Sequence, residues 1–196
     1  MRPSRGVALA LVAVLAVVAG GCGSATATPT SLYTVVPIGP TPWPNGTVGQ
    51  FGLRIEPKLL ARLPIAISGL AMNEDTESEQ TQLDDSTMGD VEAMAAAKYG
   101  DILSGDGLQV WIVRFKPDKQ TPDVYSQWID DYAAGACSQV TGDPIPSQET
   151  INNWVVDITT CGSVSSYSLA LGDGEYLSMM GLGSKDFGRL LIQQLH

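Results

Sequence analysis

LQVWIVRF, residues 108–115, is the stretch that decides the fold, because it is the clearest β-strand in this chain. β-Branched and aromatic residues dominate it, and the turn Ser104-Gly105-Asp106-Gly107 stands just before it. Such residues favour strands, and we expect a strand this apolar to lie at the centre of a sheet.

A helix is predicted directly downstream of this strand. Thr121-Pro122-Asp123 supplies an N-cap, a first-turn proline and a first-turn acid. An apolar stripe at helical spacing follows, formed by Val124, Trp128, Ile129, Tyr132, Ala133 and Ala136. The helix therefore runs into Cys137 with one face suited to packing on a sheet.

Two short elements are predicted where the folded part of the chain begins. PKLLARLP, residues 57–64, reads as a short helix or turn that Pro64 stops, since helices end at or before the residue preceding a proline. IAISGLAM, residues 65–72, predicts a strand.

The acidic stretch 74–92 comes next, and its charge pattern predicts a solvated, mobile loop in its first part. It could instead bind Ca²⁺, but it lacks the regular D-x-D-x-D-G spacing, so we expect no metal site. From Asp85 to Gly100 a helix is predicted, because helix-favouring alanines accompany apolar residues at helical spacing, namely Val91, Met94, Ala95 and Tyr99.

The last third of the chain predicts a strand meander. Strands are expected near 149–151 and at 154–161, 166–173 and 175–182, with turns at Asn152-Asn153 and at Gly172-Asp173-Gly174. A final helix is expected to start at a Ser184 cap, with one apolar face formed by Phe187, Leu190, Leu191 and Leu195.

Helices inserted among antiparallel strands predict an α+β fold, a mostly antiparallel sheet with helices packed on one face. This order of elements resembles that of PsbP-like extracytoplasmic domains. The resemblance rests on layout alone, without a shared motif.

The N-terminus has the layout of an export signal. Arg2 and Arg5 precede an apolar run from Val7 to Ala19, about 13 residues where a bilayer-spanning helix needs about 20. Ala19-Gly20-Gly21-Cys22 then resembles the lipobox of bacterial lipoproteins, although Leu or Val is commoner at its first position. The resemblance implies lipidation of Cys22 and a membrane-anchored protein on the extracytoplasmic side. The alternative is an ordinary signal peptide that is cut nearby.

Three regions follow from this interpretation: a signal peptide at 1–21, a lipidated tether at 22–52 and a single domain at 53–196. The tether carries several prolines and no charged side chain, and such a composition disfavours a packed core. Apolar residues within it, Trp43 among them, either pack along the domain or form a docking motif for a partner.

Cys137 and Cys161 remain as a pair once lipid occupies Cys22. In an oxidising compartment this arithmetic favours a disulfide, which would contribute about 3 kcal/mol by closing a loop of about 24 residues. Two buried free thiols are the alternative.

Charge and motifs exclude several function classes. The formal net charge is −10, which disfavours nucleic-acid binding. The one histidine, His196, is the last residue given, and no catalytic or nucleotide-binding motif occurs, so we expect no enzyme activity and no cofactor. The enzymatic alternative is carboxylate-based hydrolysis, for which the candidate residues are Asp130, Asp131, Asp157 and Asp173. The other interpretation of these four residues is that they are solvated surface acids.

The aromatic residues offer the one candidate ligand site. Trp111, Trp128 and Trp154, with Tyr132, Tyr167 and Tyr176, either form core or line an apolar pocket between sheet and helices. The sequence therefore predicts a lipid-anchored, non-enzymatic binding module at the cell envelope, whose partner is a small molecule or an envelope protein. An accessory subunit of an envelope complex is the alternative.

Overall fold

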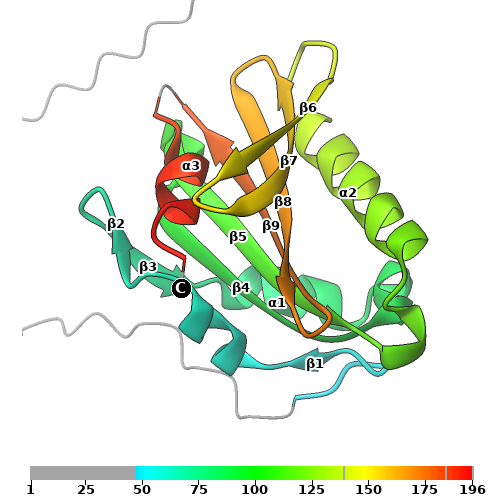
Figure 1. Cartoon of the computed structure of the whole chain (residues 1–196). Coiled ribbons are helices and arrows are strands. Elements are labelled where there is room, and N and C mark those ends of the chain that lie inside the picture. Colours follow the sequence, from blue (N-terminus) through cyan, green and yellow to red (C-terminus); the bar gives the residue numbers. More distant parts are fainter. Residues whose placement is uncertain (1–46, 139, 184, 196) are drawn as a thin grey trace, which may run out of the picture. The chain divides into compact units, whose positions relative to one another are not determined.

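A nine-stranded sheet forms the centre of the protein in the computed structural model, which describes residues 47–138, 140–183 and 185–195 (Figure 1). The predicted signal peptide, Cys22 and most of the predicted tether lie outside these residues, as do Ser184 and His196. Residues 47–52, which the sequence assigned to the tether, fold back on the domain, where the Thr47 carbonyl accepts a hydrogen bond from the Ile55 amide.

The strands follow one path with the order β2-β3-β4-β5-β9-β8-β7-β6, and β1 pairs with β4 outside that path. Neighbours on the path are antiparallel, whereas β1 and β4 are parallel. The strands are β1 (Arg54–Ile55), β2 (Ala66–Ile67), β3 (Leu70–Glu74), β4 (Val91–Asp101), β5 (Asp106–Phe115), β6 (Ile145–Ile151), β7 (Trp154–Cys161), β8 (Val164–Gly172) and β9 (Glu175–Leu182).

The predicted central strand is confirmed as β5, which pairs with β4 on one side and β9 on the other. The helix after it is also confirmed as α2 (Pro122–Cys137), and its cap Thr121 accepts a hydrogen bond from the Val124 amide. The chain thus leaves the middle of the sheet through α2 and returns to it as the meander β6 to β9.

Helices cover both faces of the sheet, so the expectation of helices on one face is wrong. The α-helices α1 (Thr76–Leu83) and α2 lie on one side, whereas α3 (Phe187–Ile192) and the 3₁₀-helix η1 (Pro57–Arg62) lie on the other. We call the first side the aromatic face and the second the aliphatic face. The α+β class and the mostly antiparallel sheet are as predicted.

The predicted helix from Asp85 to Gly100 is instead a short 3₁₀-helix, η2 (Ser86–Asp90), followed by β4. Residues on both faces of β4 are buried, including the whole run 93–97, so the strand shows no two-residue alternation. Its alanines are small enough for α1 and η1 to approach the sheet closely. Burial between two strands and two layers of helix outweighs the helix propensity of alanine.

The acidic stretch is not a mobile loop in its first part. Asp75 caps α1 by accepting a hydrogen bond from the Ser78 amide, and Glu79 is fully buried. The prediction from the charge pattern was wrong because Asp75 and Glu79 face inward, where they accept hydrogen bonds from backbone and side-chain donors.

Turn chemistry accounts for the hairpins. Asn152 and Asn153 have φ values of 47° and 69°, the conformation that the predicted turn between β6 and β7 needs. The predicted strand at 65–72 is a hairpin, β2 to β3, because Ser68 and Gly69 also have positive φ. The final helix α3 begins later than predicted, with Asp186 as its cap.

Two hydrophobic layers result, one on each face. The aliphatic face packs Leu177 and Ile112 of the sheet against Leu191 and Ile192 of α3, all fully buried. The aromatic face packs Trp111 and Phe115 against Trp128 of α2. Within the described residues, no helix has the length and apolar character needed to cross a membrane.

Candidate functional site

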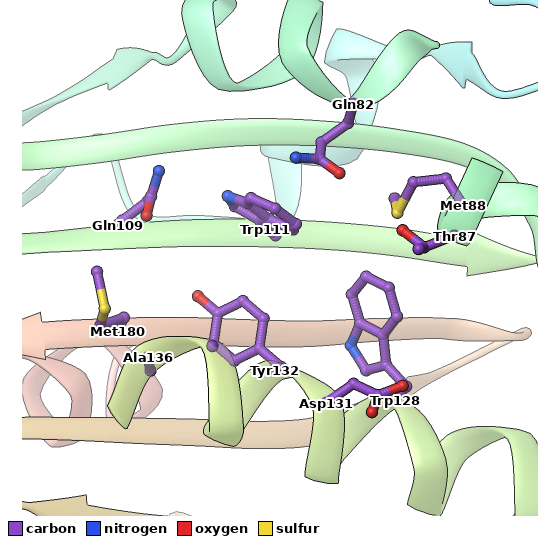
Figure 2. Close-up of a pocket in the computed structure, with 11 residues that line it drawn as sticks. Gln82, Thr87, Met88, Gln109, Trp111, Trp128, Asp131, Tyr132, Ala136 and Met180 are labelled. Atoms are coloured by element: carbon purple, nitrogen blue, oxygen red, sulfur yellow. The ribbon is translucent and has the colours of Figure 1, made fainter. Parts of the chain in front are cut away.

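A cleft of about 450 Å³ opens on the aromatic face between α1 with η2 on one side and α2 on the other (Figure 2). Strands β5 and β9 form its floor. We call it the α1–α2 cleft. Its lining consists of Gln82, Thr87, Met88, Gln109, Trp111, Trp128, Asp131, Tyr132, Gly135, Ala136 and Met180.

A row of cross-strand neighbours explains why the floor is hollow. Trp111 on β5 stands opposite Ala96 on β4 and Ser178 on β9. Both neighbours are small, so the Trp111 indole rises alone from the sheet between the two helices. Side chains that stand opposite each other on neighbouring strands normally pack together and fill the space above the sheet. Here the small side chains of Ala96 and Ser178 leave part of that space unfilled.

Three aromatic rings meet at this cleft. The ring centroids of Trp111 and Trp128 are 6.5 Å apart, and those of Trp111 and Tyr132 are 5.7 Å apart in an edge-on arrangement. Trp128 and Tyr132, one turn apart on α2, lie nearly parallel at 6.4 Å. Distances and tilts of this kind are the favourable ones for aromatic pairs.

A hydrogen bond fixes the orientation of Trp128. Its Nε1–H donates to Ser178 Oγ at 2.9 Å, and Ser178 Oγ lies 3.0 Å from Ser168 Oγ. The Trp128 indole is therefore held in place by the sheet, and its N–H is already engaged.

The wall on the α1 side is held by a polar network. Gln109 Nε2 donates to Ser78 Oγ at 2.8 Å and to Asp75 Oδ2 at 3.2 Å. Lys98, opposite Gln109 across the β4–β5 pair, is 3.7 Å from Asp75 Oδ1. These bonds join α1 to the floor of the cleft.

Glu79 anchors the same wall from inside. Its Oε1 accepts a hydrogen bond from the Ala96 amide at 2.9 Å, at a point of β4 that lies between its pairings with β1 and β3. Burial raises the pKa of Glu79 to about 7, the Ala96 hydrogen bond opposes this shift, and the nearby Glu74 and Asp75 carboxylates add to it. The position of α1 thus depends on a carboxyl group that titrates near neutral pH.

Within the described residues, one buried polar atom at the cleft has no hydrogen-bond partner. Trp111 Nε1 is buried and makes no hydrogen bond to any residue that the structure describes. The Tyr132 hydroxyl points toward the same end of the cleft (Figure 2), and burial raises the pKa of Tyr132, so this group stays a neutral O–H. A buried donor without an acceptor is costly, which makes this end of the cleft suited to a ligand oxygen.

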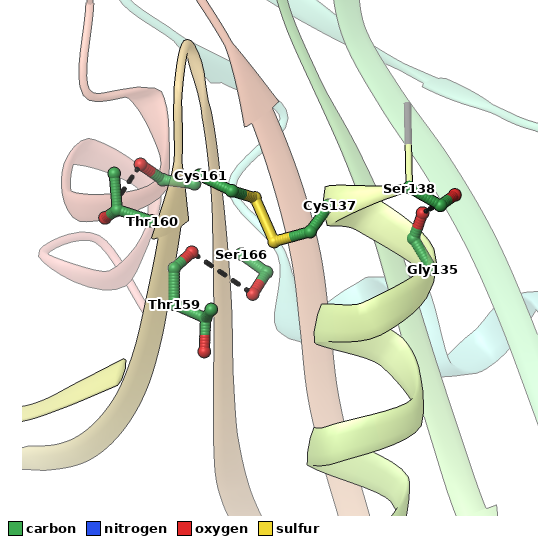
Figure 3. Close-up of a disulfide and its surroundings, with 8 residues drawn as sticks. Gly135, Cys137, Ser138, Thr159, Thr160, Cys161 and Ser166 are labelled. Atoms are coloured by element: carbon green, nitrogen blue, oxygen red, sulfur yellow. Dashed lines mark hydrogen bonds between the residues drawn. A yellow bond between two sulfur atoms is a disulfide. The ribbon is translucent and has the colours of Figure 1, made fainter. Parts of the chain in front are cut away.

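A disulfide fixes the far end of α2. Cys137, the last residue of α2, bonds to Cys161 at the end of β7 (Figure 3). The bond lies beside a small buried cluster that includes Ala136 and Val164. The cleft wall formed by α2 is therefore tied covalently to the sheet, as the cysteine count predicted.

The structure brings two of the three predicted tryptophans together. Trp111 and Trp128 line the α1–α2 cleft, with Tyr132 between them and Met180. Trp154 on β7 packs instead against the aliphatic core, on the opposite face of the sheet. Tyr167 lies with that core too, whereas Tyr176 stacks on Tyr125 outside the cleft lining.

Sequence reasoning missed the wall that α1 and η2 contribute. Gln82, Thr87 and Met88 lie in the segment predicted as a loop and a helix start. Gln109 had a usable signal, because a residue two positions from Trp111 on a strand shares its face. No local pattern indicates which helix will lie over that face.

The four acids considered for hydrolysis are spread over three elements. Asp131 is exposed at the rim of the cleft, next to Asp130 on α2. Asp157 on β7 accepts a hydrogen bond from Gln148, and Asp173 lies in the β8–β9 turn with a φ of 54°. Within the described ranges, no group of three or more His, Cys, Asp or Glu residues is arranged to hold a metal ion.

Comparison with known proteins identified no relative. A scan against protein-family models found no match, and neither did searches of the curated proteins and of the solved structures. The resemblances to bacterial lipoproteins and to PsbP-like domains therefore remain predictions.

Proposed function

We propose that this protein is a non-enzymatic binding module that holds a small ligand in the α1–α2 cleft. One observation carries the proposal: a cleft of about 450 Å³ has a floor formed by an indole whose buried N–H has no hydrogen-bond partner among the described residues. Volumes in this range are typical of small-molecule sites, as is a mostly apolar lining with a few polar groups.

The construction of the walls supports this proposal. The disulfide and the Trp128 hydrogen bond hold α2, and Glu79 and Gln109 hold α1. A site whose walls are fixed in advance loses less entropy when the ligand binds. Among the described residues of the lining none is Ser, Cys, Lys or His, the side chains that most often serve as nucleophile or base, which favours binding over catalysis.

Lipidation at Cys22, with the tether up to residue 46, would place this module at the extracytoplasmic surface of a membrane. The proposed location rests on the lipobox resemblance alone. Replacement of Cys22 by Ser would release the protein from the membrane fraction, and unchanged fractionation would contradict lipidation.

Native mass spectrometry of the full-length protein, extracted gently from its own membrane, tests the binding proposal. We expect a non-covalent adduct on the wild-type chain and its loss in Gly135→Phe. A side chain at Gly135 meets open space at the cleft wall, so the ring would fill the cleft without a clash.

Ala134→Phe provides the matched control. It adds the same ring to the same helix at an exposed position outside the lining, so the adduct should persist. Loss of the adduct in both variants, or no adduct on the wild-type chain, would contradict ligand binding in the cleft.

A second candidate function, accessory subunit of an envelope complex, is favoured by the edge strand β6. Residues 145–150 are exposed, Ile145 is 67% exposed, and the neighbouring Val155 on β7 is 57% exposed. Edge strands offer unpaired backbone groups to a partner. A photo-crosslinking residue at Thr150 should capture one membrane protein at a fixed ratio if this function is correct, and no crosslink would contradict it.

A further inference from the structure

The chemistry of the α1–α2 cleft indicates the class of ligand, an inference that rests on the binding function proposed above. We infer that the cleft binds a small organic cation, a quaternary ammonium ion or a protonated amine that also carries an oxygen atom.

Three aromatic rings provide the first argument. Trp111, Trp128 and Tyr132 line one cleft with centroids between 5.7 and 6.5 Å apart, so a group the size of a substituted ammonium lies within reach of more than one ring. Aromatic faces are electron-rich, and tryptophan is the strongest partner for a cation. The Trp128 N–H is already engaged by Ser178, so what this residue presents to a ligand is its ring.

Charge provides the second argument. Asp131 is a carboxylate at the rim, one residue before Tyr132, and among the lining residues of the described chain none is Lys, Arg or His. Lys98 stands beside Gln109 at the other end of the floor, where Asp75 partly neutralises it. With a formal charge of −10 on the whole chain, the field attracts cations and repels anions.

The two ends of the cleft then orient the ligand. Figure 2 shows Asp131 and Trp128 at one end and Gln109 with the Trp111 nitrogen toward the other. The cation would lie near Trp128 and Asp131, and an oxygen of the ligand would accept a hydrogen bond from Trp111 Nε1–H, which has no partner in the described part of the chain. That hydrogen bond would satisfy a donor that none of the residues described by the structure pairs.

Choline and 3,3-dimethylbutan-1-ol form the decisive pair of probes, because they have the same shape and hydroxyl group and differ in the charge. Both are titrated calorimetrically into the full-length chain in a non-ionic maltoside detergent. We expect choline to bind about tenfold more tightly, the size of effect that a cation over aromatic rings with a nearby carboxylate gives. Equal affinity would overturn the cation inference and leave the binding function intact.

Single substitutions locate the effect. Asp131→Asn should weaken choline about threefold and leave the alcohol unchanged, whereas Asp130→Asn, the same change outside the lining, should leave both unchanged. Trp128→Leu should reduce the preference for choline over the alcohol. An equal response of both Asp variants would show a general charge effect and overturn the site.

Failure of the inference and of the binding function remain distinguishable. If neither probe binds while the native adduct is present and lost in Gly135→Phe, the cleft binds a ligand of another class. If the adduct is also absent, both proposals are wrong.

Discussion

Two neighbouring rows of the sheet show how one strand supports both a closed core and an open cleft. On the aliphatic face, Ile112 of β5 stands between Ala95 and Leu177, and all three are fully buried beneath α3 and η1. On the aromatic face, the next residue, Trp111, stands between Ala96 and Ser178.

The difference lies in what fills each row. Branched aliphatic side chains on adjacent strands interdigitate with those of the covering helix and close the layer. A single large indole between two small residues cannot do so, and α1 and α2 stand on either side of it. The aliphatic face therefore contributes mainly stability, and the aromatic face leaves an open cleft, the proposed binding site, whose two helical walls are each held by their own contacts.

Leu177→Ala on the aliphatic face should have the largest effect on stability. Removal of a fully buried leucine costs the lost burial plus the cavity, about 4 kcal/mol. Denaturant unfolding measures this loss, and ligand affinity per folded molecule should stay unchanged. Val155→Ala, at an exposed position, is the control and should cost under about 0.5 kcal/mol. If the Leu177→Ala protein lost ligand affinity while still folded, the assignment of stability to the aliphatic face and of binding to the aromatic face would be wrong.

Loss of the disulfide should come next. Cys137→Ser combined with Cys161→Ser should lower the free energy of unfolding by about 3 kcal/mol, because the unfolded chain regains the freedom of the closed loop. The bond supports α2, so hydrogen exchange should increase in α2 and β7 and stay low in α3. An equal increase of hydrogen exchange in α2 and α3 would contradict the claim that the disulfide supports the aromatic face alone.

The smallest effect should come from the titration of Glu79. The pKa of Glu79, about 7 in the folded protein, is above the value of 4.5 in the unfolded chain, so the folded state keeps the proton up to a higher pH. The contribution of Glu79 to the free energy of unfolding is then greatest below pH 4.5 and is lost as the pH rises from 4.5 to about 7, by about 2 kcal/mol between pH 5 and pH 7.

Glu79→Gln should remove most of this pH dependence while it keeps an acceptor for the Ala96 amide. Glu77→Gln, an exposed acid on the same helix, should leave it in place. Unfolding free energies at a series of pH values measure both variants. The same slope in Glu79→Gln as in the wild type would show that Glu79 is not the group responsible.

Much of the α+β framework follows from local patterns. The central strand β5, the helix α2 with its Thr121 cap and the meander turn at Asn152-Asn153 could be predicted because cap, turn and periodicity agree there. The cysteine pair followed from counting.

The candidate site could be predicted only in part. Trp111 and Trp128 lie on elements that the pattern identified, and an apolar stripe on a helix faces the sheet. Met88 and Gln82 belong to a segment whose charge and alanine content favoured a different structure. Trp154 lies on the aliphatic face, because the pairing register of β7 decides which of its alternating side chains point to each face of the sheet.

The sequence by itself determined the elements with strong local signals, the acidic charge and the cysteines available to pair. The tertiary structure decided that the alanines of β4 form a strand, that Glu79 is buried and that Trp111 lies over small neighbours. The physical reason is that propensities and periodicities act over a few residues. Burial on both faces of a strand and the gap between two helices depend instead on residues far apart in the chain.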